Sequence, residues 1–373
     1  MTHILKGLNS RRLQVCSLCS DYGLLHESFL AVLLHSNEEN MDAEGSSLSC
    51  KAMDKLRAIP GIGLIMALMS GVLFSISSFA VEFTDQVSPC FIVIFMSIMQ
   101  LFLFIPYSLF TKESFSGVQG ERLLVILRSC FGYTSYTLGY LALLYVSFSD
   151  TQSIQFSAPV YASFFACVIL HEACGLFQVI CVIVTLLGVF MISRPSFIFG
   201  VKEEDTFTTQ DRIIGLSLSF IVSISMSLTY ITLRKLERTP TSVLIVWYSL
   251  FNVIVGVITV IVWFFVSPES LIPPRHQMDW LMMTLNGCLN AIAQIFLVLS
   301  LKLEEARLVS LMRTFDIVVA FVLQVSLSNQ PVFWESIVGA VIISSSCVSI
   351  ALRKYFNAIS NSHYSVEDQE RNV

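Results

Sequence analysis

The sequence predicts an all-α integral membrane protein whose ten transmembrane helices form two inverted five-helix repeats. Three observations support this fold class: scarce charge, a succession of long apolar runs, and a pattern of small residues that recurs at a fixed offset. Of the 373 residues, 55% are hydrophobic and 13% are charged. A soluble domain carries about 25% charged residues because its surface faces water. A chain with half that share is expected to face lipid.

Apolar runs of about 20 residues, the length that crosses a bilayer, follow one another from residue 61 to residue 352. Their order predicts ten spans joined by short connections, with one longer loop after the fifth. We place the spans at 61–82, 89–110, 123–145, 151–170, 176–193, 212–233, 241–266, 279–301, 306–327 and 331–352.

The spans divide the chain into two repeats, a loop and two polar tails. Residues 1–57 lack a sustained period and are predicted to be a disordered cytosolic tail. The first repeat covers 58–195, the inter-repeat loop 196–211, and the second repeat 212–354, followed by a cytosolic C-terminal tail at 355–373. Within the first tail, Met41 offers an alternative start, so residues 1–40 could be an optional extension.

The distribution of Lys and Arg predicts the orientation. With the N-terminus inside, twelve such residues flank the spans on the cytosolic side, and four (Arg194, Lys202, Arg212 and Arg275) lie on the other. Positive charge accumulates on the cytosolic side of membrane proteins, which places both termini in the cytosol. The loop at 194–212 runs against this rule. The sequence does not distinguish the plasma membrane from endomembranes.

The internal repeat is visible as small residues spaced by four, which share one helix face. Two carboxamides in mid-span, Gln100 and Asn252, show the same offset of 152 residues as the small residues. Chance could explain one stripe, but two stripes in register with this pair favour duplication. Small residues let helices approach closely in membranes. The stripes are Gly63, Ala67, Gly71 and Ser75 in the first span, and Gly215, Ser219, Ser223 and Ser227 in the sixth.

Polar side chains recur on single faces of the third and eighth spans. The third carries the phenols Tyr133, Tyr136 and Tyr140, and the eighth carries the carboxamides Asn286, Asn290 and Gln294. An amide that faces lipid tails costs several kcal/mol, so both faces should point inward. They could line a wet cavity or only form hydrogen bonds between helices, which contribute on the order of 0.6 kcal/mol each.

The ninth span holds two charges on one face, Arg313 and Asp316. A charge near mid-bilayer costs at least about 2.5–3.5 kcal/mol, so such a pair usually has a function. A guanidinium could bind an anionic group, with the carboxylate orienting it or carrying a proton. The alternative is a neutralised structural pair.

The sequence also gives expectations for three other residues, two near the ends of spans and one a proline within a span. Arg128 in the third span is expected to extend to the cytosolic headgroups or to act in a gate. Pro159 in the fourth span frees the backbone carbonyl of Gln155, which could help to build a binding site. Glu172 follows the fourth span and is expected to lie in water.

Several motifs resemble a known family. They are Ile-Leu-Arg at 126–128, Phe-Ser-Ala-Pro-Val at 156–160, Leu-His-Glu at 170–172, Arg-Pro-Ser-Phe-Ile-Phe-Gly at 194–200 and Thr-Phe-Asp-Ile-Val-Val-Ala-Phe at 314–321. Together they resemble the EamA-type drug/metabolite transporter superfamily, and within it the G subfamily of solute carrier family 35. The resemblance implies a ten-helix transporter with a cavity between the third, fourth, eighth and ninth helices. Relatives carry nucleotide sugars, metabolites or organic anions, and G-type members are linked to carboxylates and calcium handling.

No nucleophile–base set, Gly-rich phosphate loop or basic block occurs, so an enzyme, a cofactor, a bound metal and a nucleic-acid partner are not expected. The expected function is secondary transport or exchange of a small polar solute, such as a carboxylate anion, by alternating access. The alternatives are a nucleotide-sugar-type transporter and a non-transporting membrane regulator. Partners besides the solute and the bilayer would be a second copy or another membrane protein. The candidate binding residues are Arg313, Asp316, Asn286, Asn290, Gln294, Tyr133, Tyr136, Tyr140, Gln155, Gln100 and Asn252.

Overall fold

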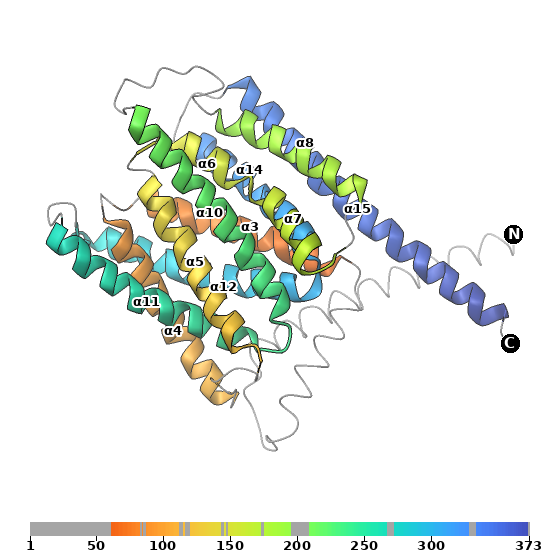
Figure 1. The fold of residues 1–373 in the computed structure, drawn as a ribbon, viewed down its shortest axis with the longest axis horizontal. Coiled ribbons are helices and arrows are strands. Elements are labelled where there is room, and N and C mark those ends of the chain that lie inside the picture. The colour runs from red at the N-terminus through yellow and green to blue at the C-terminus, as the bar shows by residue number, and fades with distance from the viewer. Residues whose placement is uncertain are drawn as a thin grey trace, which may run out of the picture. The chain divides into compact units, whose positions relative to one another are not determined.

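The structure is a computed structural model, and its described part forms one compact unit within Pro60–Val373. It describes residues 61–82, 84, 87–111, 115, 120–142, 145–146, 148–172, 175–194, 209–266, 272–327 and 333–371 (Figure 1). The predicted tail at 1–57, with Met41, lies outside the described residues, and so does most of the predicted loop at 196–211.

Every element of regular secondary structure among the described residues is a helix, and none is a strand. The first half holds α3 (Ile62–Glu82), α4 (Pro89–Phe110), α5 (Arg122–Ala142), α6 (Phe148–Gln155), α7 (Ala158–Ile169) and α8 (Leu176–Ser193). The second half holds α10 (Thr209–Lys235), α11 (Thr241–Val266), α12 (Gln277–Leu303), α13 (Ala306–Arg313), α14 (Phe315–Leu327) and α15 (Trp334–Arg371).

Eight segments among the described residues are long and apolar enough to cross a membrane, with α13 and α14 forming one of them. This confirms an all-α protein with multiple membrane spans. The predicted spans at 123–145 and 151–170 correspond to α5 and to the pair α6–α7, which are not among the eight. The pair is split into pieces of 8 and 12 residues, and α5 carries polar groups along its length. The count of ten stays a prediction.

Two of the predicted spans are broken in the middle. The first break, between α6 and α7, lies just before Pro159, whose ring nitrogen cannot donate a hydrogen bond. The carbonyl oxygen of Gln155 instead accepts a hydrogen bond of 3.4 Å from the hydroxyl of Ser223 in α10. The second break, at Thr314, separates α13 from α14, and the Thr314 hydroxyl donates to the Leu311 carbonyl at 2.6 Å.

The halves contact each other through matching pairs of helices. In one set, α3 packs against α12, and α5 packs against α10. In another, α3 contacts α13 and α14, while α10 contacts α6 and α7. Further contacts join α4 with α11 and α8 with α15, which lie side by side in Figure 1. These contacts are mirrored when the helices of the first half are exchanged for those of the second half.

The two small-residue stripes lie at these contacts, as their spacing predicts. Ala67 and Ser219 are fully buried. A Cβ atom at Gly63 would collide with the Glu304 side chain at the end of α12, and one at Gly215 would lie 2.8 Å from the Cβ of Val146. Larger residues at these two positions would push the helices apart, because interiors leave no spare volume.

The last helix is longer than predicted. The backbone of α15 stays helical from Trp334 to Arg371, beyond the expected span at 331–352 and through most of the tail at 355–373. After Gly339 the segment contains neither proline nor glycine, the two residues that most readily end a helix.

Candidate functional site

The centre of the candidate site is the charged pair predicted in the ninth span. The Nη2 atom of Arg313 lies 3.0 Å from Oδ2 of Asp316 across the break at Thr314. The Arg313 guanidinium also lies over the Phe74 ring of α3, at 4.5 Å from its centroid. The neighbouring Ser75 hydroxyl contacts the Asp316 carboxylate and donates to the Asp316 carbonyl at 2.8 Å. The pair thus joins α13 and α14 to α3.

This pair leaves hydrogen-bonding capacity unused. Among the described residues, neither Nε nor Nη1 of Arg313 has a hydrogen-bond partner of good geometry. The Tyr230 hydroxyl of α10 lies close enough to Arg313 for a weak side-chain hydrogen bond. A buried donor without a partner costs about 1–3 kcal/mol, so these groups favour a ligand that supplies acceptors.

A second buried guanidinium belongs to Arg128, and the expectation that it extends to the headgroups is wrong. Arg128 is only 1% exposed. Its Nη2 donates to Oε1 of Gln294 at 3.1 Å, and its guanidinium lies 3.8 Å from the centroid of the Tyr248 ring. An acceptor and an aromatic face hold the charge inside, where a cation–π contact is strengthened by the absence of water. Nε and Nη1 of Arg128 have no partner among the described residues.

Gly132 makes the stacking of Arg128 possible. A Cβ atom at this position would lie 2.7 Å from the edge of the Tyr248 ring. The glycine lies one turn after Arg128 on α5, and Tyr136 lies one turn further. Arg128, Gly132 and Tyr136 therefore share one face, a spacing of four that could have identified Arg128 as an inward residue from the sequence.

Tyr136 connects the two guanidinium groups. It lies beside the Asn290 side chain and within electrostatic range of Arg128 and Arg313. Asn290 in turn accepts a hydrogen bond of 2.9 Å from Nε2 of Gln100, and Gln100 accepts one of 2.6 Å from Ser249. The structure thus brings together six predicted residues (Arg313, Asp316, Asn290, Gln294, Tyr136 and Gln100) and adds Arg128 and Tyr248.

Asn252 is also buried near this cluster. It is fully buried on α11, and neither its amide nitrogen nor its oxygen has a hydrogen-bond partner among the described residues. It interacts with Tyr248, the residue on which Arg128 stacks. Both members of the predicted pair therefore lie in this network, Gln100 bonded to Asn290 and Ser249, and Asn252 beside Tyr248.

The other candidates have structural partners away from the two guanidiniums. Asn286 donates to the Ser77 carbonyl at 2.9 Å, and the Ser77 hydroxyl donates back to the Asn286 carbonyl at 3.1 Å, which fastens α12 to α3. The Tyr133 hydroxyl lies 2.6 Å from that of Thr259, between α5 and α11. The Gln155 side chain lies against Gly139 of α5. The side chain of Tyr140 lies outside the described residues.

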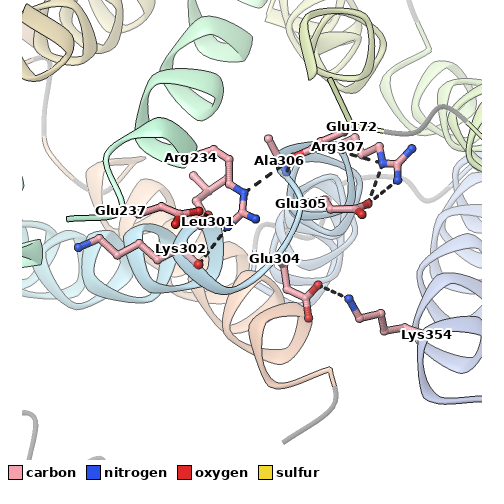
Figure 2. A network of polar contacts seen from close by, with 10 residues as sticks. All are labelled: Glu172, Arg234, Glu237, Leu301, Lys302, Glu304, Glu305, Ala306, Arg307 and Lys354. Atoms are coloured by element: carbon pink, nitrogen blue, oxygen red, sulfur yellow. Dashed lines mark hydrogen bonds and ion pairs between the residues drawn. The ribbon is translucent and has the colours of Figure 1, made fainter. Parts of the chain in front are cut away.

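A separate network of ion pairs lies where α10, α12 and α13 meet the segment after α7 (Figure 2). The Glu172 carboxylate lies 3.8 Å from both Arg234 and Arg307 and accepts a hydrogen bond of 3.3 Å from the backbone N–H of Ala306. Its side chain is only 10% exposed, so the expectation that it lies in water is wrong. We call the ten residues drawn in Figure 2 the Glu172 network: Glu172, Arg234, Glu237, Leu301, Lys302, Glu304, Glu305, Ala306, Arg307 and Lys354.

Burial raises the pKa of Glu172 above its ordinary value, because removal of water disfavours the charged form. The Ala306 N–H and the two arginines act in the opposite direction, and the nearby Glu305 adds to the increase. A salt bridge ordinarily lowers the pKa of a carboxyl, but here desolvation outweighs that lowering.

Further pairs extend the Glu172 network across the helix ends. Arg307 lies 2.5 Å from Glu305, and Lys354 of α15 lies 2.7 Å from Glu304. Arg234 donates through Nη1 to the carbonyls of Leu301 and Lys302, at 3.1 and 3.0 Å. Since Glu172 follows the first-half helix α7 and its partners belong to the second half, the network fastens the halves to each other at this end.

Comparison with known proteins identifies the family. Residues 61–194 match the EamA-like transporter family. Solute carrier family 35 member G1 of Mus musculus is 31% identical over 297 residues, which cover 79% of this chain and 80% of the mouse protein. The Homo sapiens protein of the same name is 31% identical over 303 residues, covering 80% and 81%.

One solved crystal structure has the same fold, with a TM-score of 0.65 at 16% identity over 79% of this chain and 97% of that chain. The motif resemblance is thereby confirmed: the chain belongs to the G-type solute carrier family 35, in the drug/metabolite transporter superfamily of EamA-like membrane transporters.

Proposed function

We propose that this chain is a secondary transporter or exchanger that carries a small organic anion, such as a carboxylate, by alternating access. The observation that carries the proposal is the pair of buried guanidiniums, Arg128 and Arg313, on either side of Tyr136 and Asn290. Both retain N–H donors without a partner among the described residues. Guanidinium groups bind carboxylate and phosphate oxygens through two parallel hydrogen bonds.

The charge balance of the site favours an anion over a neutral solute. Arg128 and Arg313 contribute two positive charges, and Asp316 contributes one negative charge. One net positive charge in a membrane interior is unfavourable by at least about 2.5–3.5 kcal/mol. A bound anion would neutralise it, and the unpartnered Nε and Nη1 atoms would then be satisfied.

The arrangement of the helices supports alternating access. We take the ten segments as α3, α4, α5, α6–α7 and α8, followed by α10, α11, α12, α13–α14 and α15. An odd number in each half would insert the halves in opposite orientations, and the mirrored helix contacts are what such a relation would produce. Inverted repeats of this kind can exchange conformations around a central site. The breaks at 156–157 and 314 supply interrupted helices in both halves.

The Glu172 network would act as the closed gate at one end. Glu172 joins the halves through its ion pairs with Arg234 and Arg307. Further pairs within the second half lie beside it, and their side chains are partly exposed, with Lys354 38% and Glu237 47% exposed. Each such pair contributes about 1 kcal/mol or less, so the set can open and re-form during a transport cycle. In the predicted orientation, with both termini in the cytosol, this gate faces the cytosol.

The test is uptake by the purified full-length chain in proteoliposomes loaded with unlabelled anion. Labelled carboxylates, nucleotide sugars and an organic cation would be offered in turn. We expect saturable counterflow of an anion that is abolished by the double substitution Arg313→Gln/Asp316→Asn. Folded protein that exchanges no anion would contradict the proposal and would favour the regulatory alternative, in which a homodimer or another membrane protein is the partner.

A further inference from the structure

A groove lies on the membrane-facing surface, away from the buried arginines. It has a volume of about 610 Å³, within the range of about 300–1,000 Å³ typical of small-ligand sites. Its walls come from α6, α7, α8 and α10, and the break between α6 and α7 lies in its wall. Tyr161 of α7 and Phe220 of α10 meet edge to face at 5.4 Å between their ring centroids. Phe190 of α8 and Leu216 of α10 complete the apolar lining.

The groove opens towards lipid. Phe220 and Ile221 are 47% and 45% exposed, and both belong to α10, one of the helices apolar enough to cross the membrane. The hydroxyl of Ser157, at the helix break, is already satisfied by the Ile154 carbonyl at 2.6 Å and by Ser223 at 3.1 Å. The walls therefore suit hydrocarbon.

Arg212 lies on α10 one helical turn before Leu216, a residue of the groove wall. Arg212 is exposed near the start of α10, and Arg212, Leu216 and Phe220 are spaced by four, which places them on one helix face. Eight residues of helix rise by about 12 Å, so the guanidinium lies at headgroup depth when the groove lies among acyl chains. Arg212 also belongs to the loop that runs against the positive-inside rule.

We propose that this groove binds one glycerophospholipid, with its phosphate on Arg212 and one acyl chain along Leu216, Phe220 and Tyr161. The acyl chain gains no hydrophobic free energy from binding, because the surrounding lipid tails are as apolar as the groove. The phosphate contact must therefore select the occupant, as charge complementarity at the groove mouth allows.

The bound lipid would also influence the packing of the two halves. Its acyl chain contacts α7 from the first half and α10 from the second, two helices that pack against each other. A retained lipid would therefore hold this contact together.

The test uses the purified full-length chain and a phosphatidylcholine that carries a photoactivatable diazirine in one acyl chain. After illumination we expect the label on peptides that contain Tyr161 or 216–221. A diacylglycerol with the same diazirine chain, which lacks the phosphate, should label these peptides more weakly. Lipid labelling requires no transported solute, so its outcome is independent of whether the chain carries an anion.

Two variants and two matched controls sharpen the test. Arg212→Gln should reduce labelling by phosphatidylcholine by up to about fivefold, because one exposed ion pair contributes at most about 1 kcal/mol. Ser217→Trp should block the groove and reduce labelling by both probes, because Ser217 lines it and is exposed. Arg238→Gln and Ile261→Trp alter an exposed cation and an exposed apolar residue elsewhere and should change nothing.

Two results would overturn the inference. One is equal labelling of the groove peptides in both test variants, with elution on size exclusion unchanged. The other is recovery of the label only outside the groove. Such a result would mean that the groove holds bulk lipid without preference.

Discussion

The cluster around Arg128 and Arg313 and the Glu172 network both contain arginine and carboxylate side chains, but the two regions differ in how these charges are paired. In the cluster, Arg128 and Arg313 are 1% and 7% exposed, and each keeps two nitrogen atoms without a partner among the described residues. In the network, Arg234 has two carbonyls and two carboxylates around it, and several of the pairs reach solvent. Buried arginines with few partners are suited to binding a ligand. Arginines near water that have several alternative partners are suited to a contact that opens and closes.

The largest effect should follow from removing the central cation. Arg313→Gln, combined with Asp316→Asn so that no buried carboxylate is left unpaired, should lower kcat/KM for anion uptake at least about a hundredfold, because a buried charged contact contributes about 2–5 kcal/mol. The measurement is initial-rate uptake in proteoliposomes. Arg238→Gln, which alters an exposed cation outside both regions, is the control. A comparable loss in the control would contradict a specific role of the central pair.

Arg128 should come next in effect. Arg128→Lys keeps the charge but loses both the stacking on Tyr248 and the planar donor geometry, so we expect KM to rise by about tenfold or more. Binding can be followed separately as ligand-dependent thermal stabilisation of the detergent-purified protein. An unchanged KM would show that Arg128 only fastens α5 to α11 and α12.

Tyr136 and Tyr133 provide a matched pair on one helix. Tyr136→Phe removes a hydroxyl beside Asn290 and the two arginines, and a neutral hydrogen bond contributes about 0.5–1.5 kcal/mol, so KM should rise about two- to tenfold. Tyr133→Phe removes only the contact with Thr259, and it should lower Tm slightly without changing KM. If the two variants raised KM equally, the site would extend further along α5 than we propose.

The smallest effect concerns the charge of Glu172. Because burial raises its pKa, the folded network binds the proton of Glu172 more tightly than the unfolded chain does. The resulting stabilisation is present below the ordinary pKa of the carboxyl and is lost as the pH rises through the raised value. Glu172→Gln, which mimics the neutral acid, should match the wild type at acidic pH and exceed it at neutral pH by at most about 1 kcal/mol.

This pH dependence can be measured as Tm of the two proteins in the same buffers. Glu237→Gln is the control, since Glu237 also pairs with Arg234 but is 47% exposed. An advantage of Glu172→Gln that stays constant across the pH range would contradict the predicted role of desolvation.

Much of the site could be predicted from single faces of single helices. Arg313 and Asp316 are three residues apart and do form a pair, and Asn290 and Gln294 do point into the same network. These positions could be predicted because the spacing within a helix fixes which side chains share a face. Asn286 shares that spacing but lies further along α12, where the backbone of Ser77 is its partner.

The misplaced residues depended on neighbours distant in the sequence. Arg128 could reach the headgroups in isolation, but Tyr248 and Gln294, more than a hundred residues later, hold it inside. Glu172 follows a helix end, a position that usually lies in water, yet Arg234, Arg307 and the N–H of Ala306 surround it. Neither set of partners is visible in the local pattern.

By itself, the sequence determined that the chain is a multi-span helical membrane protein, where its apolar helices run, and which faces carry small or polar residues. These properties follow from hydrophobic length and helical periodicity, which are local. The tertiary structure decided which polar faces meet, that Arg128 joins Arg313 around Tyr136, and that Glu172 is shielded from water. Those outcomes depend on how α3, α5, α10, α11, α12 and α13 are rotated against one another, and that rotation is set by packing among all of them at once.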